Sequence, residues 1–72
     1  MKEYPLYYYH RRQIKESDKD FVLARMAAIP KEHKDKVSNR YERIFRDNKG
    51  NNRKRANTFL HKVAKYFRNK ER

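Results

Sequence analysis

The sequence predicts a small all-α domain of three helices, preceded by an extended, tyrosine-rich N-terminal arm. Three observations support this prediction. A capping signal at Ser17 opens an apolar segment, and two later segments repeat apolar residues at the period of an amphipathic helix. A chain of 72 residues allows one domain, which we divide into an arm over residues 1–16 and a helical part over residues 17–70.

The arm is the least regular part of the chain. Pro5 disfavours an early helix, and the consecutive tyrosines at 7–9 favour extended backbone. We expect no second strand to pair with it, and therefore expect the arm to lie against the helices. The simpler role of the rings is packing on a lean core, with Tyr8 inward and its neighbours outward or the reverse. The alternative is that bases stack on them beside Arg11 and Arg12.

The first helix is expected over roughly residues 18–29. The run Ser17–Asp20 has the S-x-x-D form of a capping box, and its aspartates suit the positive end of the helix dipole. Residues 21–29 contain one charged residue, Arg25. We therefore expect this helix to be buried over much of its circumference and to form the centre of the fold.

The second helix is expected over roughly residues 31–47, after Pro30. Its apolar stripe consists of Val37, Tyr41, Ile44 and Phe45. Residues 48–52 then hold the only glycine and three asparagines, which favour a turn. Asn51 or Asn52 can cap the helix that follows.

The third helix is expected over roughly residues 53–69 and has the clearest amphipathic pattern. Its apolar stripe is Ala56, Phe59, Leu60, Val63, Ala64 and Phe67. With the second helix it forms an ordinary antiparallel hairpin rather than a DNA-reading helix-turn-helix, whose turn is usually shorter. The predicted core of the whole domain is Phe21, Val22, Met26, Ile29, Val37, Tyr41, Ile44, Phe45, Phe59, Leu60, Val63 and Phe67.

Charge indicates the class of partner. The chain has 21 Lys and Arg against 9 Asp and Glu, a net charge of +12. Residues 48–70 carry eight of the basic residues and no acidic one. A local excess of one sign attracts polyanions. We therefore expect the basic side of the third helix to contact nucleic acid, with a solvated face that keeps the protein soluble as the alternative.

The candidate nucleic-acid-binding residues lie mostly on this helix. Lys and Arg side chains would neutralise phosphates, and Asn57 and His61 could reach base edges. Arg11 and Arg12 of the arm would extend the track. The full set is Arg53, Lys54, Arg55, Asn57, His61, Lys62, Lys65, Arg68, Arg11 and Arg12.

Several other classes of protein are not expected. The absence of cysteine excludes disulfides, thiolate zinc sites and cysteine nucleophiles. The three histidines are widely spaced, and no serine lies in a nucleophile turn, so we expect no enzyme, no metal site and no cofactor. No apolar run approaches the ~18 residues of a membrane helix, and no signal peptide is recognisable, so we expect no membrane partner and a cytoplasmic location.

Three short motifs resemble a known family. Ile29-Pro30, then Arg40-Tyr41-Glu42, then Ala56-Asn57-Thr58-Phe59-Leu60 are similar to a helical segment of phage replication gene A proteins, which are replication-initiating endonucleases. The resemblance covers roughly residues 21–67. It implies a phage or prophage origin, a bacterial host cytoplasm and a DNA-associated context. It lies outside the nuclease core, transfers no catalytic residue and does not make the tyrosines at 7–9 nucleophiles.

The leading hypothesis is therefore a small basic DNA-binding module. One alternative is a phage-encoded adaptor or inhibitor that docks on an acidic surface of a host protein, with exposed tyrosines as anchors. Another is RNA binding, since charge does not separate RNA from DNA. The oligomeric state and any base specificity are not given by the sequence.

Overall fold

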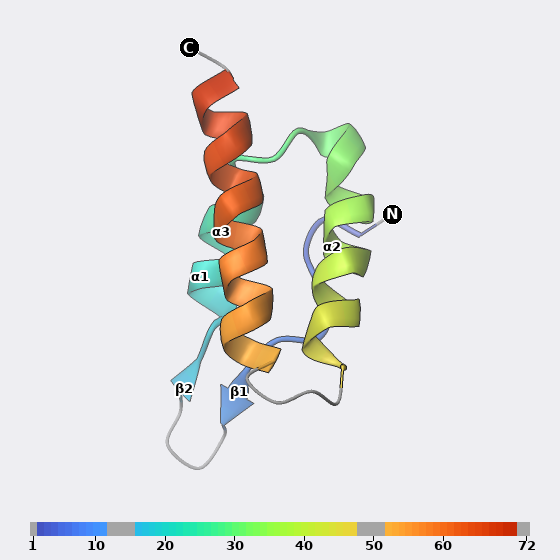
Figure 1. Ribbon diagram of the computed structural model, residues 1–72, viewed down its shortest axis with the longest axis vertical. Helices are drawn as coiled ribbons and strands as arrows, with labels where there is room; N and C mark the ends of the chain where they lie inside the picture. The colour runs from blue at the N-terminus through green and yellow to red at the C-terminus, as the bar shows by residue number, and fades with distance from the viewer. Residues whose placement is uncertain (1, 12–15, 48–51, 71–72) are drawn as a thin grey trace.

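Three helices form the body of the molecule: α1 (Lys19–Met26), α2 (Lys31–Phe45) and α3 (Asn52–Lys70). They are seen in the computed structural model, which describes residues 2–11, 16–47 and 52–70. In Figure 1, α2 descends and α3 rises beside it, so the two form an antiparallel hairpin. The predicted all-α, three-helix fold and the ordinary helical hairpin are thus confirmed.

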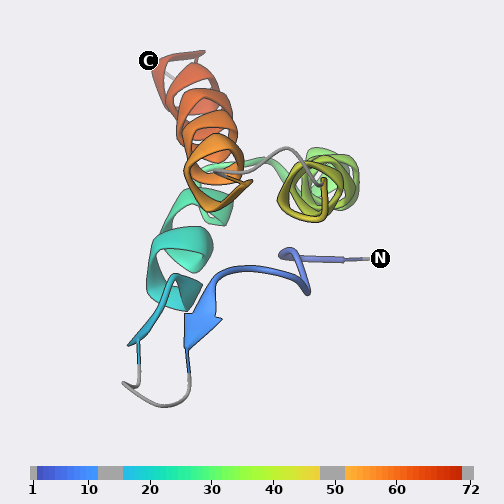
Figure 2. The same ribbon diagram turned by 60° about the horizontal axis from the view of Figure 1, so that its bottom comes forward.

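The helix at the centre of the fold is α3. Both α1 and α2 pack against it, and Figure 2 shows α2 to its right and α1 below it. The prediction that the first helix is central and buried over much of its circumference is wrong. It has only 8 residues, its Leu23 is 37 % exposed, and the neighbouring Ala24 is exposed too. Ala56 and Ala64 are fully buried on α3, where small side chains let its neighbours approach closely.

The ends of α1 differ from the prediction at both sides. The helix begins at Lys19, whose backbone N–H donates to the Ser17 hydroxyl at 3.1 Å. It ends at Met26. Ala27 N still bonds four residues back, to Leu23 O at 3.0 Å, but the two amides after it bond three residues back, Ala28 N to Arg25 O and Ile29 N to Met26 O, each at 3.1 Å. The chain tightens there because Pro30 disfavours helical backbone in the residue before it.

The junction between α2 and α3 uses Asn52 in an unexpected way. Asn52 is the first residue of α3, and its side-chain amide donates to Phe45 O at 3.0 Å and to Asp47 O. It therefore satisfies carbonyls at the end of α2 instead of capping α3. Asn51, the other predicted cap, lies outside the described residues.

The core contains all twelve predicted residues. Six are buried: Val22, Met26, Ile29, Val37, Tyr41 and Leu60. The other six are partly buried against them: Phe21, Ile44, Phe45, Phe59, Val63 and Phe67. Two rings of the arm, Tyr4 and Tyr8, join the same cluster. The inward orientation of Tyr8 is one of the two arrangements expected for the arm.

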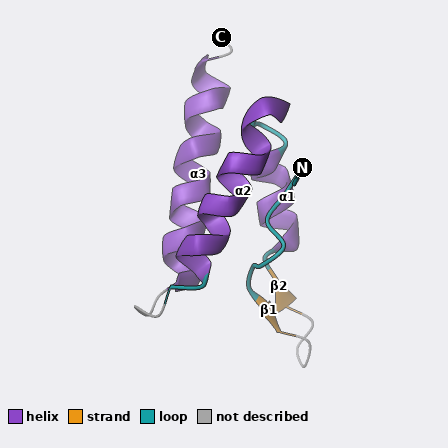
Figure 3. Cartoon of the chain, turned by 90° about the vertical axis from the view of Figure 1, so that its right-hand side faces the viewer, coloured by secondary structure: helices purple, strands orange, loops and turns teal. Residues whose placement is uncertain are grey.

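The described part of the arm, residues 2–11, lies against the helices as predicted, but it does have a strand partner. Strand β1 (His10–Arg11) pairs antiparallel with β2 (Glu16–Ser17), with His10 opposite Ser17. The expectation of an unpaired arm is wrong because Glu16 and Ser17, just ahead of the Asp18 bend that precedes α1, are extended as well. Figure 3 shows this short ladder below the helices.

A buried glutamate on α2 anchors the beginning of the arm. Glu42 Oε1 accepts from Lys2 Nζ, and Glu42 Oε2 accepts from the Leu6 backbone N–H, both at 2.8 Å. The Lys2 ammonium also donates to Asn39 Oδ1 at 2.8 Å, and the Lys2 backbone N–H donates to Asp35 Oδ1 at 3.0 Å. The arm is therefore tied to α2 at one end and to the start of α1 at the other.

Candidate nucleic-acid interface

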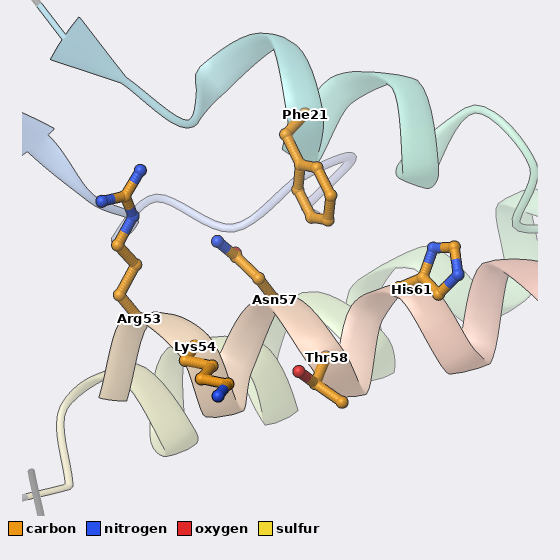
Figure 4. Close-up of a pocket in the computed structure, with 6 residues that line it drawn as sticks. All are labelled: Phe21, Arg53, Lys54, Asn57, Thr58 and His61. Atoms are coloured by element: carbon orange, nitrogen blue, oxygen red, sulfur yellow. The ribbon is translucent and has the colours of Figure 1, made fainter. Parts of the chain in front are cut away.

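An open groove runs along the seam between α1 and α3. Its first part encloses about 490 Å³ and is lined by Phe21, Arg53, Lys54, Asn57, Thr58 and His61 (Figure 4). Its second part encloses about 270 Å³ and is lined by Arg25, His61, Ala64, Lys65, Arg68 and Asn69. His61 belongs to both parts, so they adjoin. Among the described residues, no acidic side chain lines either part.

The α3 wall of this groove is one exposed helix face. Its members recur every three or four residues, the spacing that places side chains above one another on a helix. From Lys54 to Arg68 they cover 15 residues, an axial distance of about 21 Å. We call this set the groove stripe, and it consists of Lys54, Thr58, His61, Lys65 and Arg68, all exposed.

The α1 wall supplies an aromatic ring and a cation. Phe21 points from α1 toward α3 in Figure 4, and the Arg25 guanidinium carbon lies 4.3 Å from its ring centroid. The sequence analysis placed Phe21 in the core alone and gave Arg25 no role. The sequence offered one indication of this site: Arg25 is the single charged residue in the otherwise uncharged segment 21–29.

A partly buried ionic network lies at one end of the groove. Arg53 donates to both carboxylate oxygens of Asp18, from Nε at 2.8 Å and from Nη2 at 2.9 Å. Asn57 Nδ2 also donates to Asp18 Oδ2 at 2.8 Å, and the Tyr41 hydroxyl donates to Asn57 Oδ1. The Arg53 guanidinium carbon lies 3.7 Å from the ring centroid of Tyr9. The network thus joins the arm, the start of α1, and both long helices.

The pKa values of two groups in this network, the Asp18 carboxyl and the Tyr41 hydroxyl, are shifted by their surroundings. The hydrogen bond from Arg53, together with that from Asn57, lowers the pKa of the Asp18 carboxyl although burial opposes the shift. Burial raises the pKa of the Tyr41 hydroxyl, and the negative charge of Asp18 raises it further. At neutral pH Asp18 is therefore an anion and Tyr41 a neutral donor.

The network changes the role of two predicted site residues. Both polar atoms of the Asn57 amide are hydrogen-bonded within the protein, so the expected contact with base edges would require these bonds to break. Arg53 lies at the groove with a half-exposed side chain, but its guanidinium forms an ion pair with Asp18. Sequence analysis took Asp18 for a helix-dipole residue and did not find this pair.

Of the remaining predicted residues, Arg55 and Lys62 line neither part of the groove. Arg55 Nη1 is 3.6 Å from Asp47 Oδ2, and Lys62 is exposed. Arg11 belongs to β1, and only its backbone is described, whereas Arg12 lies outside the described residues. The structure thus brings together six of the ten candidates: Arg53, Lys54, Asn57, His61, Lys65 and Arg68.

Comparison with protein-family models, with curated proteins and with solved structures finds no match for this chain. The resemblance to phage replication proteins therefore stays a prediction. None of the helices within the described ranges is long and apolar enough to cross a membrane. In the same ranges, no three His, Asp or Glu side chains gather in a way that could hold a metal ion.

Proposed function

We propose that this chain binds nucleic acid, DNA in the first place, by holding a phosphate backbone along the α1–α3 groove. One observation carries the proposal: the described lining of the groove contains Lys54, Lys65 and Arg68 from α3 and Arg25 from α1, and no acidic residue. Phosphate contacts from such side chains supply most of the affinity of non-specific binding.

The dimensions of the groove stripe suit this role. Its length of about 21 Å equals the axial rise of about six base pairs of duplex DNA. Thr58 and His61 lie between the cations and can donate to phosphate oxygens or approach base edges. Binding through these residues is mainly electrostatic, so it weakens steeply as salt is added.

The choice of DNA over RNA, and the phage origin, rest on the sequence resemblance alone. The protein-binding alternative has an observation of its own, because Tyr66 is 58 % exposed and Tyr7 is 49 % exposed. Tyrosine and arginine are common anchors of protein interfaces. We rank this alternative second because these rings lie on different elements, α3 and the arm, whereas the groove cations share one seam.

A matched pair of variants on α3 tests the proposal. The groove variant is Lys54→Gln with Lys65→Gln, and the control is Lys62→Gln with Lys70→Gln. All four lysines are exposed on the same helix, and each variant removes two positive charges. Glutamine has nearly the helix propensity of lysine, so circular dichroism should show unchanged helicity in both.

The measurement is fluorescence anisotropy with labelled duplex DNA, single-stranded DNA and RNA of equal length, titrated in salt. For duplex DNA we expect the groove variant to lower the slope of log affinity against log salt by about 1.8, or 0.9 for each lost phosphate contact. The control should keep the wild-type slope. Equal losses in the two variants would mean that only overall charge matters and would overturn the proposal.

The same titration addresses the alternative. Weak binding to all three ligands that disappears with modest salt would contradict nucleic-acid binding. Recovery of a stoichiometric acidic protein from nuclease-treated lysate would then favour the adaptor hypothesis.

A further inference from the structure

We infer that the outer face of α2 is a second phosphate-binding surface, and that one molecule therefore bridges two nucleic-acid segments. The inference rests on the proposed function, because it takes the α1–α3 groove as the first surface. It starts from a cluster of cations to which the sequence analysis gave no role. We call this cluster the α2 stripe, and it consists of Lys36, Arg40, Arg43 and Arg46.

The α2 stripe is a continuous exposed row. Its members recur at intervals of four, three and three residues and extend about 15 Å along the helix axis. All four are exposed. Within the described residues, no carboxylate lies within ion-pair distance of Lys36, Arg40 or Arg43. These three cations are therefore available to an anion from outside.

Two of the acidic residues near the stripe already have basic partners. Glu42 and Asp47 line an open groove of about 550 Å³ together with Arg43 and Arg46. Glu42, however, is buried and accepts from Lys2 and from the Leu6 amide, and Asp47 pairs with Arg55. Glu32 is exposed one turn before Lys36, at the start of the helix. The stripe beyond that first turn therefore keeps its positive charge.

The two basic surfaces face away from each other. The buried side chains of α2, among them Ser38 and Tyr41, point to the core, so the α2 stripe points outward. Figure 3 views the molecule from the side of α2, so that α2 lies in front of α1 and α3. Figure 4 looks into the groove from the other side, with α2 behind α3. A rod-shaped polyanion lying in the groove thus leaves the α2 stripe uncovered.

The thickness of the protein makes simultaneous binding feasible. The molecule measures 24 × 22 Å across its two shorter axes. Electrostatic interactions in water are screened over about 8 Å at physiological ionic strength. Two duplexes held on opposite sides therefore repel each other weakly, whereas each is in direct contact with its own row of cations.

The test compares bridging with binding in one set of variants. Two short duplexes, one with a donor and one with an acceptor fluorophore, are mixed with the full chain, and energy transfer is followed as protein is added. The α2 variant is Lys36→Gln, Arg40→Gln and Arg43→Gln. The control removes three exposed lysines that lie off both surfaces: Lys19→Gln, Lys31→Gln and Lys62→Gln. Anisotropy with one labelled duplex is measured in parallel.

For the wild type and the control we expect energy transfer that rises and then falls as excess protein covers each duplex separately. For the α2 variant we expect energy transfer to fall to the level without protein, while anisotropy still reports a complex with a single duplex. The groove variant Lys54→Gln with Lys65→Gln should weaken bridging too, because it removes the other contact surface.

The outcomes separate the two proposals. Binding of single duplexes by the wild type without energy transfer would overturn bridging and leave the proposed function standing. Equal loss of transfer in the α2 variant and the control would mean condensation by overall charge and would also overturn it. Absence of duplex binding in the anisotropy measurement would overturn both.

Discussion

Asp18 shows how much one side chain can contribute in a small domain. Its carboxylate receives hydrogen bonds from Arg53 and Asn57, and its backbone N–H donates to Tyr9 O at 3.0 Å. A buried carboxylate is costly unless it is paired and hydrogen-bonded. Here the pairing is bidentate, the strongest geometry available to arginine and a carboxylate. Asp18 thus links the arm, the start of α1 and α3.

The first prediction concerns the replacement Asp18→Asn. We expect it to lower the free energy of unfolding by about 2 kcal/mol at neutral pH, the usual scale for hydrogen bonds to a charged group. The pKa of Asp18 is lowered in the folded protein, so its contribution is present above the unfolded pKa of about 3.9 and is lost as pH falls through the folded pKa. The measurement is urea unfolding, followed by circular dichroism, at about pH 7 and in acid.

The difference between wild type and variant isolates Asp18 from the other carboxylates, which titrate in both proteins. It should be largest at neutral pH and should shrink toward zero in acid. The exposed Asp20, replaced in the same way, serves as a control and should change stability little at either pH. A difference for Asp18→Asn that does not depend on pH would contradict the ionic role of the pair.

The Asp18 pair also marks a limit of sequence analysis at the residue scale. Asp18 lies directly before a helix, where an aspartate is readily explained by the helix dipole. Its partner Arg53 is 35 residues away, and only the packing of α1 on α3 brings the two together. Asn57 was likewise predicted to contact bases because its two hydrogen-bond partners, Tyr41 and Asp18, lie far away in the sequence.

At the scale of elements, the arm and α2 behave as one unit. Glu42 is buried, and its two oxygens accept from an ammonium and from a backbone amide of the arm. The second prediction is that Glu42→Gln releases the beginning of the arm while the helices stay folded. Gln has an NH₂ donor in place of one of the two accepting oxygens and carries no charge, so it cannot reproduce the observed bonds from Lys2 to one oxygen and from the Leu6 amide to the other.

Hydrogen exchange checks this prediction, because the Leu6 amide should exchange faster in the variant while amides of α3 keep their protection. Glu32→Gln on the same helix is the matched control, since Glu32 is exposed and makes no ion pair among the described residues. Faster exchange throughout the three helices would instead show that the arm is required for the whole fold.

The helices were predictable because their signals are local. The apolar stripes of α2 and α3 recur at helical spacing, and every residue of the predicted core lies in the core. The short length of α1 and the pairing of the arm were not predictable in the same way. The length of α1 depends on the tightened turn before Pro30. The pairing of the arm depends on the extended backbone of Glu16 and Ser17, and the sequence at these two residues shows no pattern typical of a strand.

At the scale of the whole molecule, charge is distributed differently in space than along the chain. Residues 48–70 contain no acidic residue, yet Asp18 pairs with Arg53 and Asp47 pairs with Arg55. The acid-free stretch is therefore partly neutralised at its beginning. The α3 side of the candidate groove could be predicted from helical spacing, whereas Phe21 and Arg25 could not, because their position depends on the packing of α1.

The third prediction follows from the net charge of +12 on so small a body. Like charges repel one another in the compact state, and added salt screens this repulsion. The described ion pairs, which salt would weaken, are few and partly buried, so we expect self-repulsion to dominate. Moderate sodium chloride should therefore raise the melting temperature, by about 4 °C for each kcal/mol by which screening of the repulsion raises the free energy of unfolding.

Salt is thus expected to have opposite effects on two properties: it raises the melting temperature of the free protein, and it lowers the affinity for nucleic acid. Thermal unfolding followed by circular dichroism at low and moderate salt measures the first of these effects. The control Lys62→Gln with Lys70→Gln lowers the net charge without altering the groove or any described ion pair, so it should melt higher than wild type at low salt and respond less to added salt. A melting temperature that falls with salt would mean that the pairs at Asp18 and Glu42 outweigh the repulsion among the exposed cations.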